Sequence, residues 1–492
     1  MSNMLDQKIH EEHNFLEALS IAYFRGFLSE QVVEFAHPNG TLGSGLTIII
    51  GENNSGKTTI LTALANFEER YGTLETDEKH HNELTRICLK DCKGDSFDWI
   101  YKKRNKWGVK ETVDNTLFSV SPYHIRYLSS RRIWEDEFEL YDEDVKDKNY
   151  HYEVTERIYK ADRGSYASSI LNDEFGKILA AIYEQKETRD AFNKAVRGFI
   201  PHFYSWTISR KSRDKYIFTY KTKNKIQHRG SYLGGGVINL IKILSIFFIN
   251  SSDHIVLIDE PELGLHPQIQ KKLANFLSEK SKEMQIIIAT HSPYFVNWED
   301  LKNGANIARV FKDSSGQVSL ANLNRDFEPL KTIINEDWKK PYQLDVVAKE
   351  YFFANKVVFV EGQEDKSLLE KLCTEERIPL NFEFYGYGVG GFSKIRSYLA
   401  ISKHLGIKAG AFFDKGGDGD KYYDELVEEY GKEFYLRKNI KEDIRDKENV
   451  EIKDGIAEIK YIKGDFKEGI VKPRSKKRLL KYIQGFNKFF LK

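Results

Sequence analysis

The chain has 492 residues, of which 40% are hydrophobic, so it is long enough for about two or three domains. Its 75 Lys and Arg against 74 Asp and Glu exclude a strong overall attraction for nucleic acid, so any such surface must be local. Three cysteines exclude a disulfide scaffold, segment 1–12 is too polar for a signal peptide, and the longest apolar stretch, 243–249, is too short to cross a bilayer. We therefore expect a cytoplasmic protein with no membrane partner.

A glycine-rich loop lies between a predicted buried strand, 46–50, and a predicted helix that begins at Lys57. The loop has the spacing G-x-x-x-x-G-K-[ST], whose backbone N–H groups surround phosphate together with the positive end of the helix. We expect Lys57 to reach the β- and γ-phosphates of ATP and Thr58 to bind Mg²⁺. The predicted ATP-binding residues are Gly51, Asn53, Asn54, Ser55, Gly56, Lys57, Thr58 and Thr59.

An insertion is predicted over about residues 120–230, with helical spacing of apolar residues over 170–200. Basic residues gather over 210–229, where they alternate with aromatic ones in the pattern of a hairpin. Such residues either contact the phosphates of DNA or form a charged edge strand that discourages aggregation. The DNA-contact candidates here are Arg210, Lys211 and Arg213.

Two later apolar strands end in residues suited to ATP hydrolysis. Strand 255–258 is followed by Asp259, expected in the Mg²⁺ shell, and by Glu260, expected at the attacking water. Strand 286–289 is followed by Thr290 and His291. Taken singly, an acid pair at a strand end is often only solvated, and a histidine there is often a hydrogen-bonded turn residue. Upstream, Gly234, Gly235 and Gly236 introduce an apolar helix over 238–250.

In this order, these segments resemble the ABC-type ATPase head of the RecF and SMC class. The resemblance implies an ATP-sandwich dimer of heads, or a higher oligomer. In such a dimer Gly234, Gly235 and Gly236 of one head cover the γ-phosphate bound by the other, and His291 senses that phosphate. The glycine segment departs from the usual Ser-Gly-Gly pattern.

Carboxylates follow two further apolar strands in the last third of the chain. Glu361 follows strand 357–360, and Asp365 falls in the first turn of the next predicted helix. Asp414 follows strand 411–413 and precedes a loop with Asp418 and Asp420. Because parallel strands end at one edge of a sheet, these carboxylates are expected to converge. They offer the hard oxygen ligands that Mg²⁺ prefers.

This second arrangement resembles a TOPRIM domain, the fold shared by topoisomerases, primases and some nucleases. TOPRIM domains usually carry Asp-x-Asp, whereas Gly416 stands at the second position here. Asp418 or Asp420 is a candidate substitute through a longer loop, and a flexible surface loop is the alternative.

An ABC-type head followed by a TOPRIM domain resembles the OLD (overcoming lysogenization defect) family of ATP-dependent nucleases. We expect an α/β fold with a head over 1–340 and a TOPRIM domain with a basic tail over 341–492. The resemblance implies two-metal cleavage of DNA with Mg²⁺ or Mn²⁺, and it adds Glu442 as a ligand and Lys476 or Lys477 against the scissile phosphate. It further implies anti-phage defence, with or without an accessory protein or an RNA or DNA element.

Two other functions remain open from the sequence. In one, the chain is an ATPase sensor or scaffold whose TOPRIM domain is catalytically silent, which the missing Asp-x-Asp allows. In the other it is a primase or topoisomerase, although no priming site or nucleophilic tyrosine domain is evident.

Overall fold

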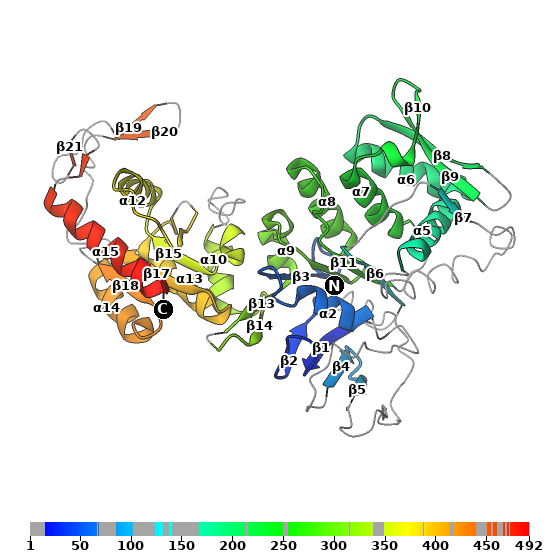
Figure 1. Cartoon of the computed structure of the whole chain (residues 1–492). Helices are drawn as coiled ribbons and strands as arrows, with labels where there is room; N and C mark the ends of the chain where they lie inside the picture. Colours follow the sequence, from blue (N-terminus) through cyan, green and yellow to red (C-terminus); the bar gives the residue numbers. More distant parts are fainter. Residues whose placement is uncertain are drawn as a thin grey trace, which may run out of the picture. The chain divides into compact units, whose positions relative to one another are not determined.

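A computed structural model describes most of the chain, and it divides into two compact units, Met1–Asn324 and Arg325–Lys492. The described residues are 15–65, 67, 85–101, 124–130, 137–139, 167–211, 215–248, 254–313, 315–337, 349–386, 388–413, 418–438, 450–453, 456–459, 466–467, 470–471 and 473–491. Figure 1 shows the helices and strands of each unit.

A six-stranded sheet forms the centre of the first unit, in the order β14-β13-β3-β12-β11-β6. All neighbours pair in parallel except β13 and β14. Every residue of β3 and β12 is buried, as expected for β-branched runs covered on both faces. The strands are β3 (Leu46–Gly51), β6 (His124–Leu128), β11 (His254–Asp259), β12 (Ile286–Ala289), β13 (Asn306–Lys312) and β14 (Val318–Leu323).

The helix that follows β3 packs on this sheet. It is α2 (Lys57–Ala65), and it contacts β3, β6, β11 and β12. Its residues Ile60, Leu61 and Leu64 are fully buried in a core shared with an antiparallel sheet of order β2-β1-β4-β5. The strands of that sheet are β1 (Leu16–Ala22), β2 (Gln31–Glu34), β4 (Thr85–Asp91) and β5 (Ser96–Tyr101).

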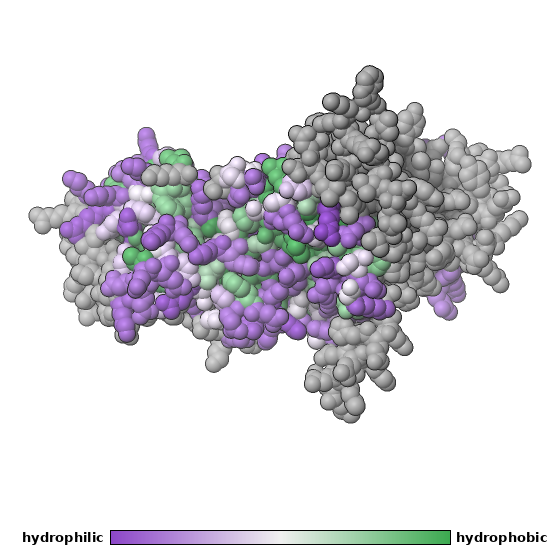
Figure 2. All heavy atoms as spheres, turned by 90° about the horizontal axis from the view of Figure 1, so that it is seen from below, coloured by the Kyte–Doolittle hydropathy of each residue, from purple (hydrophilic) through white to green (hydrophobic). Residues whose placement is uncertain are grey.

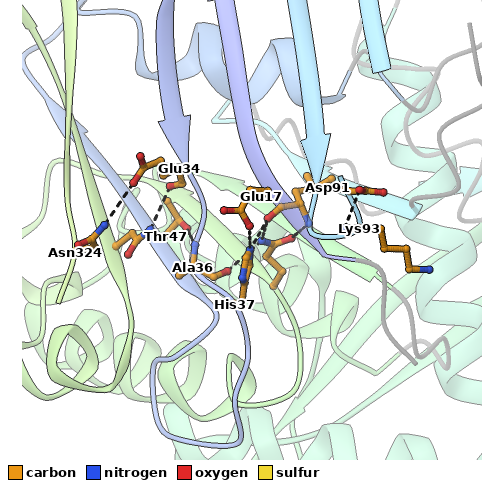
Figure 3. A network of polar contacts seen from close by, with 11 residues as sticks. Glu17, Glu34, Ala36, His37, Thr47, Asp91, Lys93 and Asn324 are labelled. Carbon is orange, nitrogen blue, oxygen red and sulfur yellow. Dashed lines mark hydrogen bonds and ion pairs between the residues drawn. The ribbon is translucent and has the colours of Figure 1, made fainter. Parts of the chain in front are cut away.

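Polar contacts fasten the antiparallel sheet to the central one, as Figure 3 shows from close by. The Ala36 N–H donates to Thr47 Oγ1 of β3 at 2.9 Å. Beside it, His37 Nε2 lies 3.3 Å from a carboxylate oxygen of Glu17 on β1. Gln285, just before β12, is 1% exposed. Its Nε2 donates to the Leu16 and Ala36 carbonyls at 2.8 and 3.1 Å, and its Oε1 accepts from the Leu16 N–H at 2.9 Å.

The insertion forms a helical and antiparallel layer. Its helices are α5 (Ala167–Glu184) and α6 (Lys186–Phe199), which confirms the helical prediction over 170–200. Strands β8 (Phe203–Arg210) and β9 (Lys215–Thr222) pair in the expected antiparallel way, and β7 (Glu137–Glu139) and β10 (Gln227–Arg229) also pair with β9. Trp206 packs edge-on against Phe192 of α6 at 5.8 Å, which joins the strands to the helices.

Further helices and short 3-10 turns complete the first unit. Helix α7 begins directly after the insertion, and α8 joins β11 to β12. These elements are η2 (Gly230–Tyr232), α7 (Gly235–Ile246), α8 (Pro267–Lys280), η3 (Pro293–Phe295) and α9 (Trp298–Asn303).

The second unit has a parallel sheet of order β16-β15-β17-β18. Its helix α15 buries Leu479, Ile483, Phe486 and Phe490 in the same core as Val358 and Val360 of β15. The sheet strands are β15 (Lys356–Val360), β16 (Glu383–Phe384), β17 (Lys408–Phe413) and β18 (Tyr435–Lys438). The helices and 3-10 turn are α10 (Glu328–Asp337), η5 (Glu350–Phe353), α12 (Gln363–Glu375), α13 (Phe392–His404), α14 (Asp418–Tyr430) and α15 (Pro473–Leu491). Two short hairpins pair β19 (Val450–Lys453) with β20 (Ile456–Ile459) and β21 (Phe466–Lys467) with β22 (Ile470–Val471).

Helix α10 belongs to the second unit by its packing. Phe327, next to its first turn, stacks on His404 of α13 at 4.6 Å between ring centroids. The compact units therefore divide between Asn324 and Arg325. The expected domain boundary at residue 340 lies outside the described residues and stays a prediction.

One face of the described surface is predominantly polar. On the face shown in Figure 2, hydrophilic residues cover most of the coloured area and hydrophobic ones lie between them. None of the helices in the described ranges is long and apolar enough to cross a membrane.

The first testable prediction concerns Gln285. Replacing it with alanine removes the Gln285 partner of the buried Leu16 N–H and of the Ala36 carbonyl, while the Leu16 carbonyl keeps its contact with His37 Nε2 at 3.0 Å. We therefore expect the first unit to lose roughly 1–3 kcal/mol of unfolding free energy. Urea unfolding followed by tryptophan fluorescence measures this loss. The matched control is Gln268→Ala on the exposed first turn of α8. Equal stability of the two variants would contradict the bridging role.

Candidate functional site: a phosphate loop and a carboxylate strand edge

The glycine-rich loop follows β3 as predicted, and glycine is required at its first position. Gly51 has φ +153°, and a Cβ there would lie 2.2 Å from the Val310 carbonyl oxygen of β13. Gly56 has φ +113° and lies against the Phe27 ring, where a Cβ would come within 3.2 Å. The loop therefore has no room for side chains at these positions.

Lys57 is buried at the first turn of α2, with 6% of its surface exposed. Its Nζ donates to the carbonyls of Gly51 and Glu52 at 3.1 and 2.7 Å. Burial lowers the pKa of Lys57 to about 8, although the charge of Asp259 acts in the opposite direction. The ammonium is thus held over the loop that was predicted to surround the phosphates.

Thr58 and Asp259 meet beside this loop. The Thr58 Oγ1 donates to Asp259 Oδ2 at 2.9 Å, and Asp259 is 1% exposed at the end of β11. Ser55 Oγ in the loop is buried and has no hydrogen-bond partner. The paired oxygens of Thr58 and Asp259 suit a Mg²⁺ ion, and the buried Ser55 hydroxyl suits a hydrogen bond to a nucleotide.

The other ATPase candidates lie at the same edge of the sheet. The register aligns Asp259 of β11 with Ala289 of β12, and Ala289 with Ile49 of β3. Glu260 follows Asp259, and its N–H donates to the Ala289 carbonyl at 2.8 Å. Thus Glu260 and His291 both follow strands that end level with the phosphate loop.

His291 is half-buried, and burial lowers its pKa, with the Lys57 charge acting in the same direction. Its backbone N–H donates to Glu262 Oε1 at 2.6 Å, and Thr290 Oγ1 donates to Glu262 Oε2 at 2.7 Å. Our sequence analysis did not single out Glu262. The available signal was an acid two residues after the Asp259-Glu260 pair, in a segment rich in turn residues.

The glycine segment lies at the start of α7. Gly234 precedes the helix, and a Cβ on Gly234 or Gly235 would meet nothing within 4 Å. At Gly236, in contrast, a Cβ would lie 2.0 Å from the Gly264 carbonyl oxygen. Gly234 and Gly235 are therefore exposed, while Gly236 is in close backbone contact with the loop that follows β11.

The structure describes only part of the predicted nuclease site. Val360, the last residue of β15, is aligned with Phe412 of β17, so these parallel strands end at the same edge, with β17 one residue longer. Glu361 follows β15 directly, and Asp414, which lies outside the described residues, follows β17. The Glu361 carbonyl accepts from the N–H groups of Gly390 and Gly391 at 3.0 and 3.1 Å, which fixes the backbone that carries its side chain.

The remaining predicted ligands have different positions. Asp365 is 8% exposed, and its Oδ2 accepts from the Gly362 N–H at 2.9 Å, so it caps the first turn of α12. Asp418 begins α14, but its side chain is not described, and Glu442 lies outside the described residues. Among the side chains that are described, no three His, Cys, Asp or Glu residues form a metal-binding group.

The DNA-contact candidates are likewise described in part. Lys211 is exposed after β8, which ends at Arg210, whereas Arg213 lies outside the described residues. On α15, Lys477 is exposed and Lys476 forms an ion pair with Glu376.

Comparison with known proteins supports both halves of the chain. Residues 46–297 match the family model described as "AAA domain, putative AbiEii toxin, Type IV TA system". Residues 352–415 match the model "Overcoming lysogenization defect protein-like, TOPRIM domain". The chain thus joins an AAA-type ATPase domain to a TOPRIM domain.

The relatives agree with this class. The Old nuclease of Escherichia phage P2 is 24% identical over 302 residues, 56% of this chain and 50% of that protein. The OLD nuclease of Thermus scotoductus is 28% identical over 185 residues, 36% of this chain and 34% of that protein. The chain therefore spans about half or less of the length of these relatives.

Among solved structures, an Smc head domain from Pyrococcus furiosus bound to part of ScpA covers 66% of this chain and 99% of its own, with 17% identity and a TM-score of 0.41. The first family model matches about half of the chain, so the chain belongs to the AAA-domain ATPase family. Its second unit carries a segment that matches a TOPRIM domain of the OLD type.

The second prediction follows from the pKa of Lys57, which is about 8 in the free protein. Nucleotide phosphates favour the protonated ammonium, so above this pKa binding must also protonate Lys57. We expect the dissociation constant of Mg²⁺-free ADP to rise by about tenfold from about pH 7 to about pH 9. Isothermal titration calorimetry in two buffers of different ionisation enthalpy measures both the affinity and the proton uptake.

The control for this prediction is Lys57→Arg, whose guanidinium stays charged over the whole range. Its affinity is expected to be lower but independent of pH. An equal pH dependence in both proteins would show that another group titrates.

Proposed function

We propose that this chain is an ATP-binding and ATP-hydrolysing DNA endonuclease whose TOPRIM domain cleaves phosphodiester bonds with Mg²⁺ or Mn²⁺. The observation that supports the nuclease half is the parallel pairing of β15 and β17, which end within one residue of each other at one edge of the sheet. A carboxylate residue follows each strand directly, in a segment that matches an OLD-type TOPRIM domain. The DNA substrate agrees with the nuclease names of the relatives.

In the ATPase half, each predicted side chain has a separate role in binding or hydrolysing ATP. Lys57 binds the β- and γ-phosphates, while Thr58 and Asp259 hold Mg²⁺, which neutralises phosphate charge. Glu260 orients the attacking water and accepts its proton, and His291 contacts the γ-phosphate. The exposed Gly234 and Gly235 are available to cover the nucleotide bound by a second head, which would make pairing of heads depend on ATP.

In the nuclease half, divalent cations supply an activated water and stabilise the leaving oxygen. Glu361, Asp414 and Asp365 would hold these cations, and Asp365 also caps the first turn of α12. Asp418 and Glu442 complete the proposed ligand set. Lys477, exposed on α15, and the basic residues Arg210, Lys211, Arg213 and Lys476 are the proposed contacts to DNA phosphates.

We place this activity in the cytoplasm, in defence against phages, with ATP-dependent pairing of heads controlling access to the nuclease site. An accessory protein or an RNA or DNA element is a further proposed partner. A catalytically silent TOPRIM domain in an ATPase sensor is the competing function, and the nuclease experiment decides between the two.

The third prediction tests the nuclease. Glu361→Gln and Asp414→Asn each remove a negative ligand and keep the side-chain shape, so plasmid cleavage with Mg²⁺ or Mn²⁺ is expected to fall by at least about a hundredfold. Gel analysis of nicked and linear plasmid, with and without ATP, measures this. Glu383→Gln, exposed at the start of β16, is the matched control. A wild-type chain that cuts no DNA under any of these conditions would favour the sensor.

The fourth prediction concerns Glu260. Glu260→Gln removes the base but leaves the phosphate contacts, so ATP turnover is expected to fall by about 10²–10⁴-fold while nucleotide binding persists. Without hydrolysis the paired heads should accumulate, and light scattering with ATP should show twice the mass of the chain. Glu283→Gln, exposed before β12, serves as the control. Unchanged turnover would refute the catalytic assignment of Glu260.

A further inference from the structure

The loop between β11 and α8, residues 260–266, is fastened to two neighbouring segments by side-chain contacts. On one side, the carboxylate of Glu262 accepts from Thr290 Oγ1 at 2.7 Å and from the His291 N–H at 2.6 Å. These distances are in the range of charge-assisted hydrogen bonds. Both oxygens of one carboxylate therefore bind the two residues that follow β12.

The Glu262 carboxylate accepts a backbone N–H just beyond the point where the pairing of β11 and β12 ends. The ladder between β11 and β12 ends at Asp259 and Ala289, followed by one bond from the Glu260 N–H to the Ala289 carbonyl. The Thr290 N–H still donates to Ile49 of β3 at 3.0 Å. The next N–H, that of His291, has the Glu262 carboxylate as its partner, so a side chain rather than a strand determines the backbone position of His291.

The same loop contacts the glycine segment on its other side. A Cβ on Gly236 would lie only 2.0 Å from the Gly264 carbonyl oxygen, so the two backbones are in close contact. In addition, Asn239 Nδ2 of α7 donates to the Leu263 carbonyl at 3.0 Å. Gln270 of α8 adds a further link, since its Nε2 donates to Leu265 and its Oε1 accepts from Ser292 Oγ, at 2.8 and 2.7 Å. One short loop thus joins the glycine segment to the segment that carries His291.

We propose that Glu262 is a positioning residue for ATP hydrolysis, whose carboxylate holds the backbone of His291 at the γ-phosphate side of the phosphate loop. Glu262 acts through His291 and does not itself contact the nucleotide. The proposal rests on the ATPase half of the proposed function. Burial raises the pKa of Glu262, whereas its hydrogen bonds from the His291 N–H and the Thr290 hydroxyl act in the opposite direction and favour the ionised carboxylate.

Two substitutions at Glu262 separate the loss of its hydrogen bonds to residues 290 and 291 from the loss of its negative charge. Glu262→Ala removes both hydrogen bonds. In Glu262→Gln, the amide oxygen still accepts from the His291 N–H, and the amide nitrogen can donate to Thr290 Oγ1. Glu279→Ala, which removes an exposed acid of α8 paired with Lys282, is the matched control.

We expect Glu262→Ala to lower kcat for ATP by about tenfold to a hundredfold, as for other small displacements of a catalytic group, with KM within about threefold of wild type. Glu262→Gln should stay within about threefold of wild type in both constants. A merely structural role would instead lower ATP affinity and the melting temperature together.

A second measurement needs no nucleotide. Hydrogen–deuterium exchange of the free protein, followed on peptides that contain residues 290–293, should be faster in Glu262→Ala and unchanged in Glu262→Gln and Glu279→Ala. Exchange in α2 should stay the same in all four proteins. If Glu262→Ala does not fold, Thr290→Val removes one of the two donors to Glu262 and should lower kcat, by less than about tenfold. Its readout is kcat alone, because Thr290 Oγ1 also accepts from the Ser292 N–H at 3.0 Å and the loss of that bond would itself speed exchange at 290–293.

Three results would overturn the proposal: a Glu262→Ala kcat equal to that of Glu279→Ala, a Glu262→Gln kcat as low as that of Glu262→Ala, or a rise in KM alone. A wild-type chain that turns over no ATP would instead overturn the proposed ATPase function together with this role. Turnover in the wild type with equal rates in the variants would leave the ATPase intact and remove Glu262 alone.

Discussion

The parallel pairing of β3, β12 and β11 is the constraint on which the ATPase site depends. The site takes its side chains from three segments, residues 51–58, 259–260 and 290–291. The first and the last of these are more than two hundred residues apart in the chain, yet the register places the ends of their strands level. A shift in register would draw the polar residues that flank each apolar run into the covered sheet and would displace Asp259 from Thr58. The hydrophobic effect that fixes the sheet thereby also fixes the distances between catalytic groups.

This constraint explains why much of the first unit could be predicted from the sequence. The apolar runs 46–50, 255–258 and 286–289 are strands because β-branched residues fill a sheet covered on both faces, and the polar residues after them must lie at its carboxyl edge. The spacing of the phosphate loop is a local property, so the contact of Thr58 with Asp259 followed once the strands were aligned. Helices α5 and α6 could also be predicted, because their apolar residues recur at helical spacing.

The contacts that the sequence did not reveal are those between loops. The bond of Glu262 to the His291 N–H joins residues 29 apart in the chain, and no periodicity marks it. The same holds for Gln285, whose amide spans 269 residues to reach Leu16. Asp365 shows a related difficulty, because an acid three residues after Gly362 suits both a metal ligand and a helix cap, and the structure shows the cap. The spacing of residues in the sequence shows where carboxylates follow strands. Which hydrogen-bond donor each carboxylate contacts depends on distances between loops, which the sequence does not show.

Both halves of the chain use the same device to fix a residue beyond the end of its strand. In the first unit, Gly264 has φ +71° and lies in backbone contact with Gly236. In the second, Gly388 has φ +79°, and a Cβ there would lie 2.6 Å from the Gly362 carbonyl carbon, while two nearby glycine N–H groups bind the Glu361 carbonyl. A side chain at either glycine would separate the two backbones, and the conformation with positive φ would be strained. The loops that carry Glu262 and Glu361 are therefore fixed by close backbone contacts that only glycine permits, beyond the point where strand pairing ends.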